Sequence, residues 1–177
     1  MKIGVLADTH IPDRRPALPS RVLEIFSTVE IVLHAGDITE MFVLQELLDQ
    51  VSLTFAVHGD RDPMSVREHL PETQVLEFGG QRLGLIHGHR DRGTEFNATL
   101  RGLLRRGKPD KTLTDYLLSR FSDVNAIIFG HTHLPYAKMH GDVFLFNPGS
   151  IVPRRGEPSV GLIEIDGRGI RGRVLPL

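Results

Sequence analysis

Aspartate and histidine fall in this sequence into short clusters, and each cluster directly follows an apolar run typical of a buried strand. The clusters are Asp8-Thr9-His10, Gly36-Asp37, Gly59-Asp60-Arg61-Asp62, His87-Gly88-His89 and Gly130-His131-Thr132-His133, and Asn147-Pro148-Gly149-Ser150 follows a sixth run. Carboxylate oxygen and neutral imidazole nitrogen are good ligands for Mn²⁺, Fe²⁺ and Zn²⁺. The sequence therefore predicts a metal site built from the ends of several strands.

Two of these clusters pair side chains that are two residues apart, Asp8 with His10 and His131 with His133. In extended backbone such residues project to the same side, so we expect each pair to reach one cation. One pair of this kind arises easily by chance, but five ordered clusters at strand ends do not. Three further histidines stand outside the paired motifs and are interpreted as structural or surface residues: His34, His69 and His140.

The elements that must position these clusters alternate in the first third of the chain. Apolar runs predict strands over residues 2–7, 31–33 and 53–57, and helical spacing predicts helices over 18–28 and 44–51. This strand-helix-strand order is typical of a parallel α/β core. In such sheets ligands bind beyond the carboxyl ends of the strands, which is where the clusters fall.

The second half of the sequence changes pattern. Gly79-Gly80 predicts a hairpin between residues 75–78 and 82–86, and Asp166-Gly167 predicts a closing hairpin. Further strands are expected over 126–129, 143–146, 160–165 and 170–175, and helical stripes over 96–104 and 113–121. No linker or repeat divides the chain, so we expect one domain spanning residues 1–177.

Composition limits the class of protein. The chain has 177 residues, 40% hydrophobic content, a net charge of −1 and no cysteine. These values exclude disulfides, thiolate metal sites and a strong overall attraction to nucleic acid. No apolar run approaches the roughly 20 residues of a membrane span. We therefore expect a cytoplasmic, soluble protein without a membrane partner.

Taken together, the ordered motifs resemble those of the calcineurin-like metallophosphoesterases, and in particular of their small prokaryotic phosphodiesterase branch. The resemblance covers nearly the whole chain. It implies an α/β fold, a four-layer αββα sandwich of two mixed β-sheets with flanking helices. It also implies a hydrolase that cleaves a small phosphodiester through a metal-bridging hydroxide.

The same resemblance implies a dinuclear metal centre. The first metal takes Asp8, His10 and His133, the second takes Asp60, His87 and His131, and Asp37 bridges both. Two divalent cations are expected, with Mn²⁺ as the first choice and Fe²⁺, Ni²⁺, Co²⁺ or Zn²⁺ as alternatives. The catalytic residues are expected to be Asp37, Asp60, Arg61 and His89.

The third motif departs from the family pattern, which normally reads Gly-Asn-x-Asp and often has histidine after the asparagine. Here Asp60 adds a carboxylate, and we hypothesise that this extra charge favours monoanionic diesters over dianionic monoesters. Arg61 stays protonated, so it can contact a phosphate oxygen but cannot act as a general acid. Without a proton donor the rate falls by ~10²–10⁴, which favours good leaving groups. Three residues are the candidates to replace that donor: His58, Asp62 and His89.

Two alternative functions stay open. One is a scaffold or binding module, because a eukaryotic member of this fold works in a sorting coat and has a similar Gly-Asp-x-Asp motif; the retained Asp37 favours the enzyme. The other is a nuclease or cyclic-nucleotide phosphodiesterase. A cationic rim of Arg90, Arg92 and Arg154 could serve it, whereas Arg101, Arg105, Arg106, Lys108 and Lys111 fit a solvated helix face. Nucleic acid is not favoured because the chain has no Trp and two Tyr for base stacking. A homo-oligomer could use the apolar segment 134–136.

Overall fold

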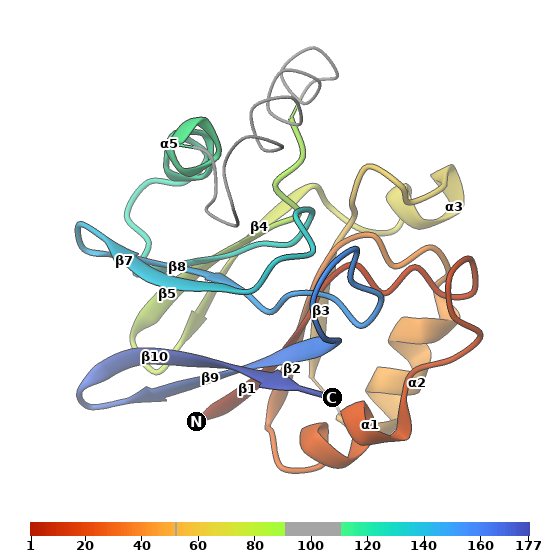
Figure 1. The fold of residues 1–177 in the computed structure, drawn as a ribbon. Helices are drawn as coiled ribbons and strands as arrows, with labels where there is room; N and C mark the ends of the chain where they lie inside the picture. Colours follow the sequence, from red (N-terminus) through yellow and green to blue (C-terminus); the bar gives the residue numbers. More distant parts are fainter. Residues whose placement is uncertain (52, 91–110) are drawn as a thin grey trace.

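The structure is a computed structural model that describes residues 1–51, 53–90 and 111–177 (Figure 1). The helical stripe expected over 96–104 lies outside the described residues. So do five basic residues considered from the sequence: Arg92, Arg101, Arg105, Arg106 and Lys108.

The first sheet has the strand order β10-β9-β1-β2-β3. Three neighbouring strands at one side of it form the predicted parallel unit: β1 (Lys2–Leu6), β2 (Ile31–Ala35) and the edge strand β3 (Thr54–Val57). The closing hairpin is also confirmed, with β9 (Ser159–Asp166) antiparallel to both β1 and β10 (Gly169–Pro176). Parallel pairing brings the carboxyl ends of β1, β2 and β3 to one edge of the sheet.

The second sheet has the order β4-β5-β6-β8-β7. The hairpin predicted around Gly79-Gly80 joins β4 (Thr73–Phe78) to β5 (Gln81–Ile86). The remaining strands are β6 (Ala126–Ile128), which is parallel to both β5 and β8 (Val143–Asn147), and the edge strand β7 (Tyr136–His140). The sequence did not reveal β7, because the three central residues of this strand are exposed and show no apolar alternation.

The helices lie outside the two sheets. In Figure 1, α1 (Ser20–Phe26) and α2 (Phe42–Gln50) lie beside the first sheet, and α5 (Lys111–Ser119) lies beside the second. The short α3 (Met64–Arg67) follows the loop after β3 and was not predicted. This layering confirms the expected αββα sandwich. None of the described helices has the length and apolar character that crossing a bilayer requires.

The core explains why these elements pack in this order. One buried cluster joins both sheets, with Val5 and Leu33 from the first sheet and Leu85 and Phe146 from the second. Two outer clusters seat α1 and α2 on the first sheet and α5 on the second. Each large apolar side chain that is fully buried contributes about 1.5–3 kcal/mol. The sheets are therefore held rigidly together at the edge where the polar loops emerge.

One detail of the predicted helix over 44–51 is wrong. The buried face of α2 consists of Val43, Leu44 and Leu47, whereas Leu48 is 40% exposed. An α-helix has 3.6 residues per turn, so a buried face centred on Val43 and Leu47 leaves Leu48 at the margin of that face.

Candidate metal centre

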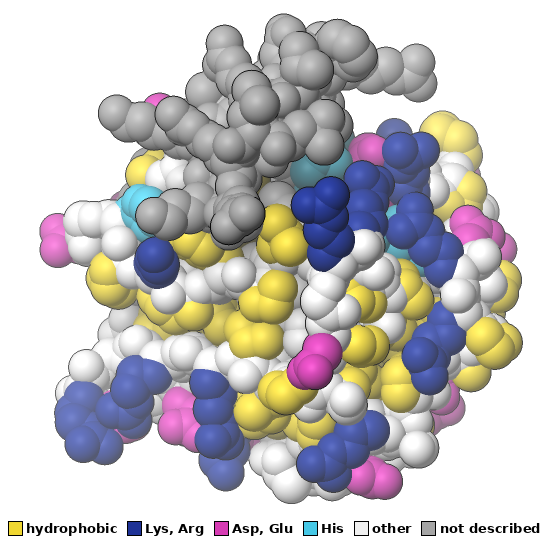
Figure 2. Space-filling model, in the orientation of Figure 1, with side chains coloured by type: hydrophobic (Ala, Val, Ile, Leu, Met, Phe, Trp, Pro, Cys, Tyr) yellow, Lys and Arg dark blue, Asp and Glu magenta, His cyan; other side chains and the backbone are white. Residues whose placement is uncertain are grey.

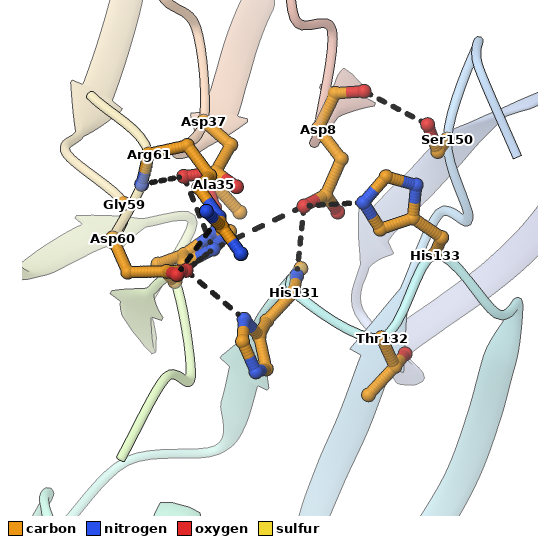
Figure 3. Close-up of polar contacts among 12 residues, drawn as sticks. Asp8, Ala35, Asp37, Gly59, Asp60, Arg61, His131, Thr132, His133 and Ser150 are labelled. Carbon is orange, nitrogen blue, oxygen red and sulfur yellow. Dashed lines mark hydrogen bonds and ion pairs between the residues drawn. The ribbon is translucent and has the colours of Figure 1, made fainter. Parts of the chain in front are cut away.

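Five loops converge at the carboxyl ends of β1, β2, β3, β5 and β6, and they bring all seven predicted ligands together. Figure 3 shows Asp8, Asp37, Asp60, His131 and His133 in this arrangement. Three groups of these residues have ligand atoms within 4.8 Å of one another: Asp8, His10 and His133; Asp60, His87 and His131; and Asp8, Asp37 and His87. The first two groups are the two ligand sets that the sequence resemblance implied.

Cluster one consists of Asp8, His10 and His133. His133 Nε2 lies 3.5 Å from Asp8 Oδ1 and 3.3 Å from His10 Nε2. The two imidazole rings stack at 5.2 Å between centroids with an interplanar angle of 18°. His133 Nδ1 bonds the Val152 carbonyl at 3.3 Å, which leaves Nε2 facing the cluster. All three side chains are buried, so the cluster is a prepared ligand set.

Cluster two consists of Asp60, His87 and His131. One oxygen, Asp60 Oδ1, lies 3.2 Å from both His87 Nε2 and His131 Nδ1. His87 Nδ1 donates to the Ala35 carbonyl at 2.8 Å, which fixes the ring and directs Nε2 inward. Cluster two is more open than cluster one, because Asp60 and His131 keep partial exposure.

Asp37 lies between the clusters and presents one oxygen to each. Its Oδ2 is 3.6 Å from His10 Nε2 in cluster one, and its Oδ1 is 3.4 Å from His87 Nε2 in cluster two. The residue is only 2% exposed. A carboxylate divided in this way has the geometry of a bridging ligand.

The backbone at the ligands differs from the sequence expectation. Five ligands lie in the left-handed region: Asp8 at φ 53°, His10 at 49°, Asp37 at 55°, His131 at 65° and His133 at 57°. The expectation that Asp8 and His10, or His131 and His133, project from extended backbone is therefore wrong. Such backbone costs roughly 1 kcal/mol or more at each non-glycine residue and is typical of functional sites. Tight turns after the strands, rather than strand pleating, aim these side chains.

Two glycines are required because backbone approaches the carboxylates closely. A Cβ on Gly59 would collide with the Asp37 carboxylate and come within 2.6 Å of the Asp37 nitrogen. A Cβ on Gly130 would lie 2.9 Å from Asp8 Oδ2 and 2.8 Å from the Ala7 Cβ. All of these distances are shorter than normal van der Waals contact, so only glycine fits at these two positions.

Asp62 holds the loops together. Its Oδ1 accepts hydrogen bonds from the amides of Ile38 (2.8 Å) and Thr39 (2.7 Å), and its Oδ2 accepts from those of Asp37 (3.0 Å) and Gly59 (2.7 Å). The residue is 3% exposed. Its expected candidacy as proton donor to a leaving group does not fit, because the whole carboxylate is occupied by backbone amides. Asp62 instead fixes the positions of Asp37 and of the Gly59-Asp60 loop.

The protonation states suit a cation. Burial lowers the pKa of His10 and lowers that of His133 to about 4, so both rings are neutral and ready to bind. Burial raises the pKa of Asp8 to about 7. Burial opposes protonation of His87, but hydrogen bonds to Asp37 and other carboxylates outweigh it and raise the pKa of His87 well above its ordinary value. A metal would displace the protons of Asp8 and His87.

The donor set fits a divalent transition metal in each cluster. Each cluster offers one carboxylate and two imidazoles, and Asp37 adds an oxygen to both. Within the described parts of the chain, Asp8 Oδ2 is buried and has no hydrogen-bond partner. A buried carboxylate oxygen without a partner is costly unless a cation neutralises it. The residues present therefore fit the group that the motifs imply.

Arg61 lies at the rim of cluster two. Its side chain is 64% exposed, and its Nε is 3.4 Å from Asp60 Oδ2, the oxygen that faces away from the two histidines. Its backbone amide donates to Asp37 Oδ1 at 2.8 Å. The guanidinium thus stands beside the extra carboxylate and offsets part of its charge, which the sequence argument about Asp60 left out.

The other histidines divide as expected. His89 lies beside cluster two, with its ring centroid 5.6 Å from that of His87, and its Nδ1 is buried without a partner in the described structure. His34 is fully buried beneath the site and shares a hydrogen bond with Thr9 Oγ1 at 3.1 Å. His69 bonds the Ser65 carbonyl, and His140 bonds the Tyr136 hydroxyl. Of these four histidines, only His89 lies beside the predicted ligands at the site.

Two arginines stand beside cluster one. Arg154 was considered from the sequence, whereas Arg14 was missed, because nothing in its local sequence marks it. Burial and the neighbouring His10 act most strongly on the pKa of His133, and the charges of Arg154 and Arg14 lower it further. Both guanidinium groups are therefore within electrostatic reach of this ligand.

Residues 1–168 match the calcineurin-like phosphoesterase superfamily domain. The chain is 37% identical over 177 residues to a probable metallophosphoesterase of Methanothermobacter thermautotrophicus, covering 99% of this chain and 92% of the relative. It is 26% identical over 189 residues to a phosphodiesterase of Methanocaldococcus jannaschii, covering 99% of each. Zinc-complexed Vps29 of Entamoeba histolytica shares the fold, with a TM-score of 0.73, 24% identity and 99% of each chain covered. The chain therefore belongs to the calcineurin-like phosphoesterase superfamily, and the expectation of a metal-dependent phosphoesterase is confirmed.

Proposed function

We propose that this protein is a phosphodiesterase that uses two divalent metal ions, and that residues 1–177 act as one domain. The observation that carries the proposal is the position of Asp37, with one oxygen 3.6 Å from His10 and the other 3.4 Å from His87. A carboxylate shared between two ligand clusters can serve as a common ligand only when each cluster holds a metal ion. The shared core of the two sheets supports a single domain.

In this proposal each metal takes the cluster described above. Asp8, His10 and His133 would hold the first metal, Asp60, His87 and His131 would hold the second, and Asp37 would serve both. Mn²⁺ is the first choice, and Fe²⁺, Ni²⁺, Co²⁺ or Zn²⁺ are alternatives, because mixed carboxylate and imidazole sites accept several of these ions. When bound, the metal pair activates a water molecule and neutralises charge on the phosphoryl oxygens.

The protein's own residues position the substrate and handle the leaving group. Arg61 is exposed beside Asp60 and can rotate to contact a phosphate oxygen. Its permanent charge prevents it from donating a proton. With Asp62 fully occupied by backbone amides, His89 is the better-placed candidate to donate that proton, because its Nδ1 has no partner in the described residues. Burial lowers the pKa of His89, so less of it carries the proton that an acid must supply. His58, whose Nδ1 lies 3.4 Å from the carbonyl of Gly59, is the second candidate.

A metal titration tests the proposal directly. The metal-free protein is loaded in turn with Mn²⁺, Ni²⁺, Co²⁺ or Zn²⁺ and assayed with bis(p-nitrophenyl) phosphate. We expect hydrolysis with at least one metal, and a loss beyond 100-fold in Asp37→Asn, since even residues that merely support metal ligands are worth about 10–100-fold. Silence with every metal would favour a scaffold or binding module on this fold.

Substrate preference follows from the extra carboxylate. Asp60 makes the site less positive than an asparagine would, and Arg61 offsets this only in part because its side chain is largely in water. We therefore expect diesters to be preferred over monoesters, and Asp60→Asn to shift kcat/KM toward the monoester. An unchanged ratio between p-nitrophenyl phosphate and its diester would refute the charge argument.

The leaving group gives an independent test. If His89 supplies the proton, His89→Gln should slow the cleavage of alkyl diesters by ~10²–10⁴ and affect nitrophenyl diesters much less. The control is His69→Gln, since His69 lies away from the site and bonds the Ser65 carbonyl. Equal slowing of both substrates by His89→Gln would show that His89 positions a ligand instead.

A further inference from the structure

The surface beside cluster one is cationic, and the proposed reaction does not account for its charge. Figure 2 shows Lys and Arg side chains gathered at the upper right of the molecule, where the loops after β1 and β8 lie in Figure 1. Arg14 belongs to the first loop and Arg154 to the second, and both are exposed. The net charge of the whole chain is −1, so this patch is a local feature and not a general basic character.

Backbone contacts hold the loop of Arg14 to cluster one. The Arg14 amide donates to the carbonyl of the ligand His10 at 2.8 Å. On the other side of that ligand, the His10 amide donates to the Asp37 carbonyl at 3.0 Å. The turn that carries Arg14 therefore begins at one metal ligand and is tied to another.

The loop of Arg154 is held in the same way. Ser150 Oγ donates to the Asp8 carbonyl at 2.8 Å, and the Val152 amide donates to Ser150 Oγ at 3.0 Å. The Val152 carbonyl meets His133 Nδ1 at 3.3 Å. Arg154 follows two residues later, so each arginine is fixed within four residues of a group that touches cluster one.

Neither arginine has an acidic partner among the described residues. Among the described residues, six other arginines pair with a carboxylate: Arg21, Arg61, Arg82, Arg120, Arg168 and Arg171. Two exposed arginines that have no acidic partner in the described residues, carried on loops held to cluster one, are suited to bind a phosphate, since guanidinium pairs with phosphate oxygens in a bidentate manner.

We propose that Arg14 and Arg154 form a second phosphate-binding subsite beside cluster one, which selects small phosphodiesters that carry a further phosphate group. This inference rests on the proposed phosphodiesterase function, and it adds the class of substrate. A small molecule fits better than a nucleic acid strand, because the patch is local and the chain has no Trp and two Tyr for stacking bases.

A matched pair of substrates tests the subsite. Thymidine 5′-(p-nitrophenyl phosphate) and its 3′-phosphorylated form have the same reacting ester and differ only in the second phosphate. We expect the parent protein to prefer the second by about tenfold in kcat/KM, since each exposed ion pair contributes a factor of roughly two to five. The double variant Arg14→Met/Arg154→Met should lose this preference and keep its rate on the first substrate within about twofold.

The matched control is Arg168→Met, an exposed arginine that pairs with Asp166 on the far hairpin and should keep the preference. A binding measurement needs no turnover: equilibrium dialysis of the Mn²⁺-loaded protein with thymidine 3′,5′-bisphosphate and with thymidine 5′-monophosphate. Loss of the preference for the bisphosphate in the double variant supports the subsite even if neither ester is hydrolysed, in which case only the proposed function fails.

Three results would overturn the subsite. The first is a parent protein that treats both substrates alike, and the second is a double variant that retains the parent's preference. The third comes from a competition experiment, in which single-stranded oligothymidylates of increasing length compete with thymidine 3′,5′-bisphosphate in the dialysis. Affinity that climbs with each added nucleotide and falls steeply with salt would assign the patch to a nucleic acid instead.

Discussion

Asp62→Asn is the most informative single substitution, because it replaces one heavy atom in a carboxylate that accepts four hydrogen bonds. The carboxylate of Asp62 receives two backbone amides on each oxygen. An asparagine amide keeps one oxygen and replaces the other with an NH₂ donor. If its oxygen faces Ile38 and Thr39, its NH₂ group faces the amides of Asp37 and Gly59, and donors then oppose donors.

The magnitude follows from this geometry. Two hydrogen bonds to a charged acceptor are lost, at about 1.5–3 kcal/mol each, so the free energy of unfolding should fall by about 3–6 kcal/mol. Small domains have roughly 5–15 kcal/mol in total, so the loss is large without necessarily unfolding the protein. The displaced Asp37 backbone should also weaken metal binding, since the position of the Asp37 carboxylate between the two clusters depends on it.

The assay is urea unfolding of the metal-free protein, followed by circular dichroism, with the Mn²⁺-dependent rise in melting temperature as a second measurement. The control is Asp142→Asn, an exposed aspartate in the turn between β7 and β8, which should leave the midpoint unchanged. A fall in the free energy of unfolding below about 1 kcal/mol in Asp62→Asn would refute the reasoning, because it would mean that the amides left without an acceptor find other partners at little cost. Should the variant not fold, Asp62→Glu, which keeps the charge, separates loss of charge from loss of shape.

Two further outcomes are expected. Gly59→Ala places a methyl group against the Asp37 carboxylate, so it should lower the free energy of unfolding by about 1–3 kcal/mol and weaken Mn²⁺ binding. The control Gly167→Ala has open space at its Cβ and should change neither. Equal urea midpoints for the two variants would contradict this prediction. Metal binding should release protons, because the raised pKa values of Asp8 (about 7) and His87 keep both groups protonated in the metal-free protein at mildly acid pH. Affinity should therefore rise with pH up to about 7 and more gradually above it, once Asp8 has lost its proton, and calorimetry in buffers of different ionisation enthalpy measures the protons released; a pH-independent affinity between pH 5.5 and 7 would contradict the assignment.

Much of the site was predictable because ligand chemistry is encoded locally. The seven predicted ligands share two residue types, and each follows a short apolar run that is typical of a buried strand. The parallel strands then bring their carboxyl ends to one edge. The grouping of Asp8 with His10 and His133 was implied by the family resemblance, and the structure brings the three side chains together. The gap between Asp8 and His133 in the sequence was no obstacle once the family resemblance was established.

The features that the sequence did not predict have one common cause, which is that they depend on contacts with distant parts of the chain. The edge strand β7 and the short helix α3 form through contacts made elsewhere in the chain, so their own residues show no pattern. The left-handed backbone of the predicted ligands was unexpected because it is uncommon at any non-glycine residue, and the surrounding turns enforce it here. Asp62 was considered as an acid, and burial against four amides made it a structural anchor.

The sequence by itself determined the family, the ligands and the strands that precede them, since residue type and apolar periodicity are properties of short segments. The tertiary structure decided how those residues are arranged: Asp37 faces both clusters, Arg61 lies beside the extra carboxylate of Asp60, and the loops of Arg14 and Arg154 are both held to cluster one. These relations join residues that are far apart in the chain, and they exist only because packing of the two sheets fixes the loops against one another.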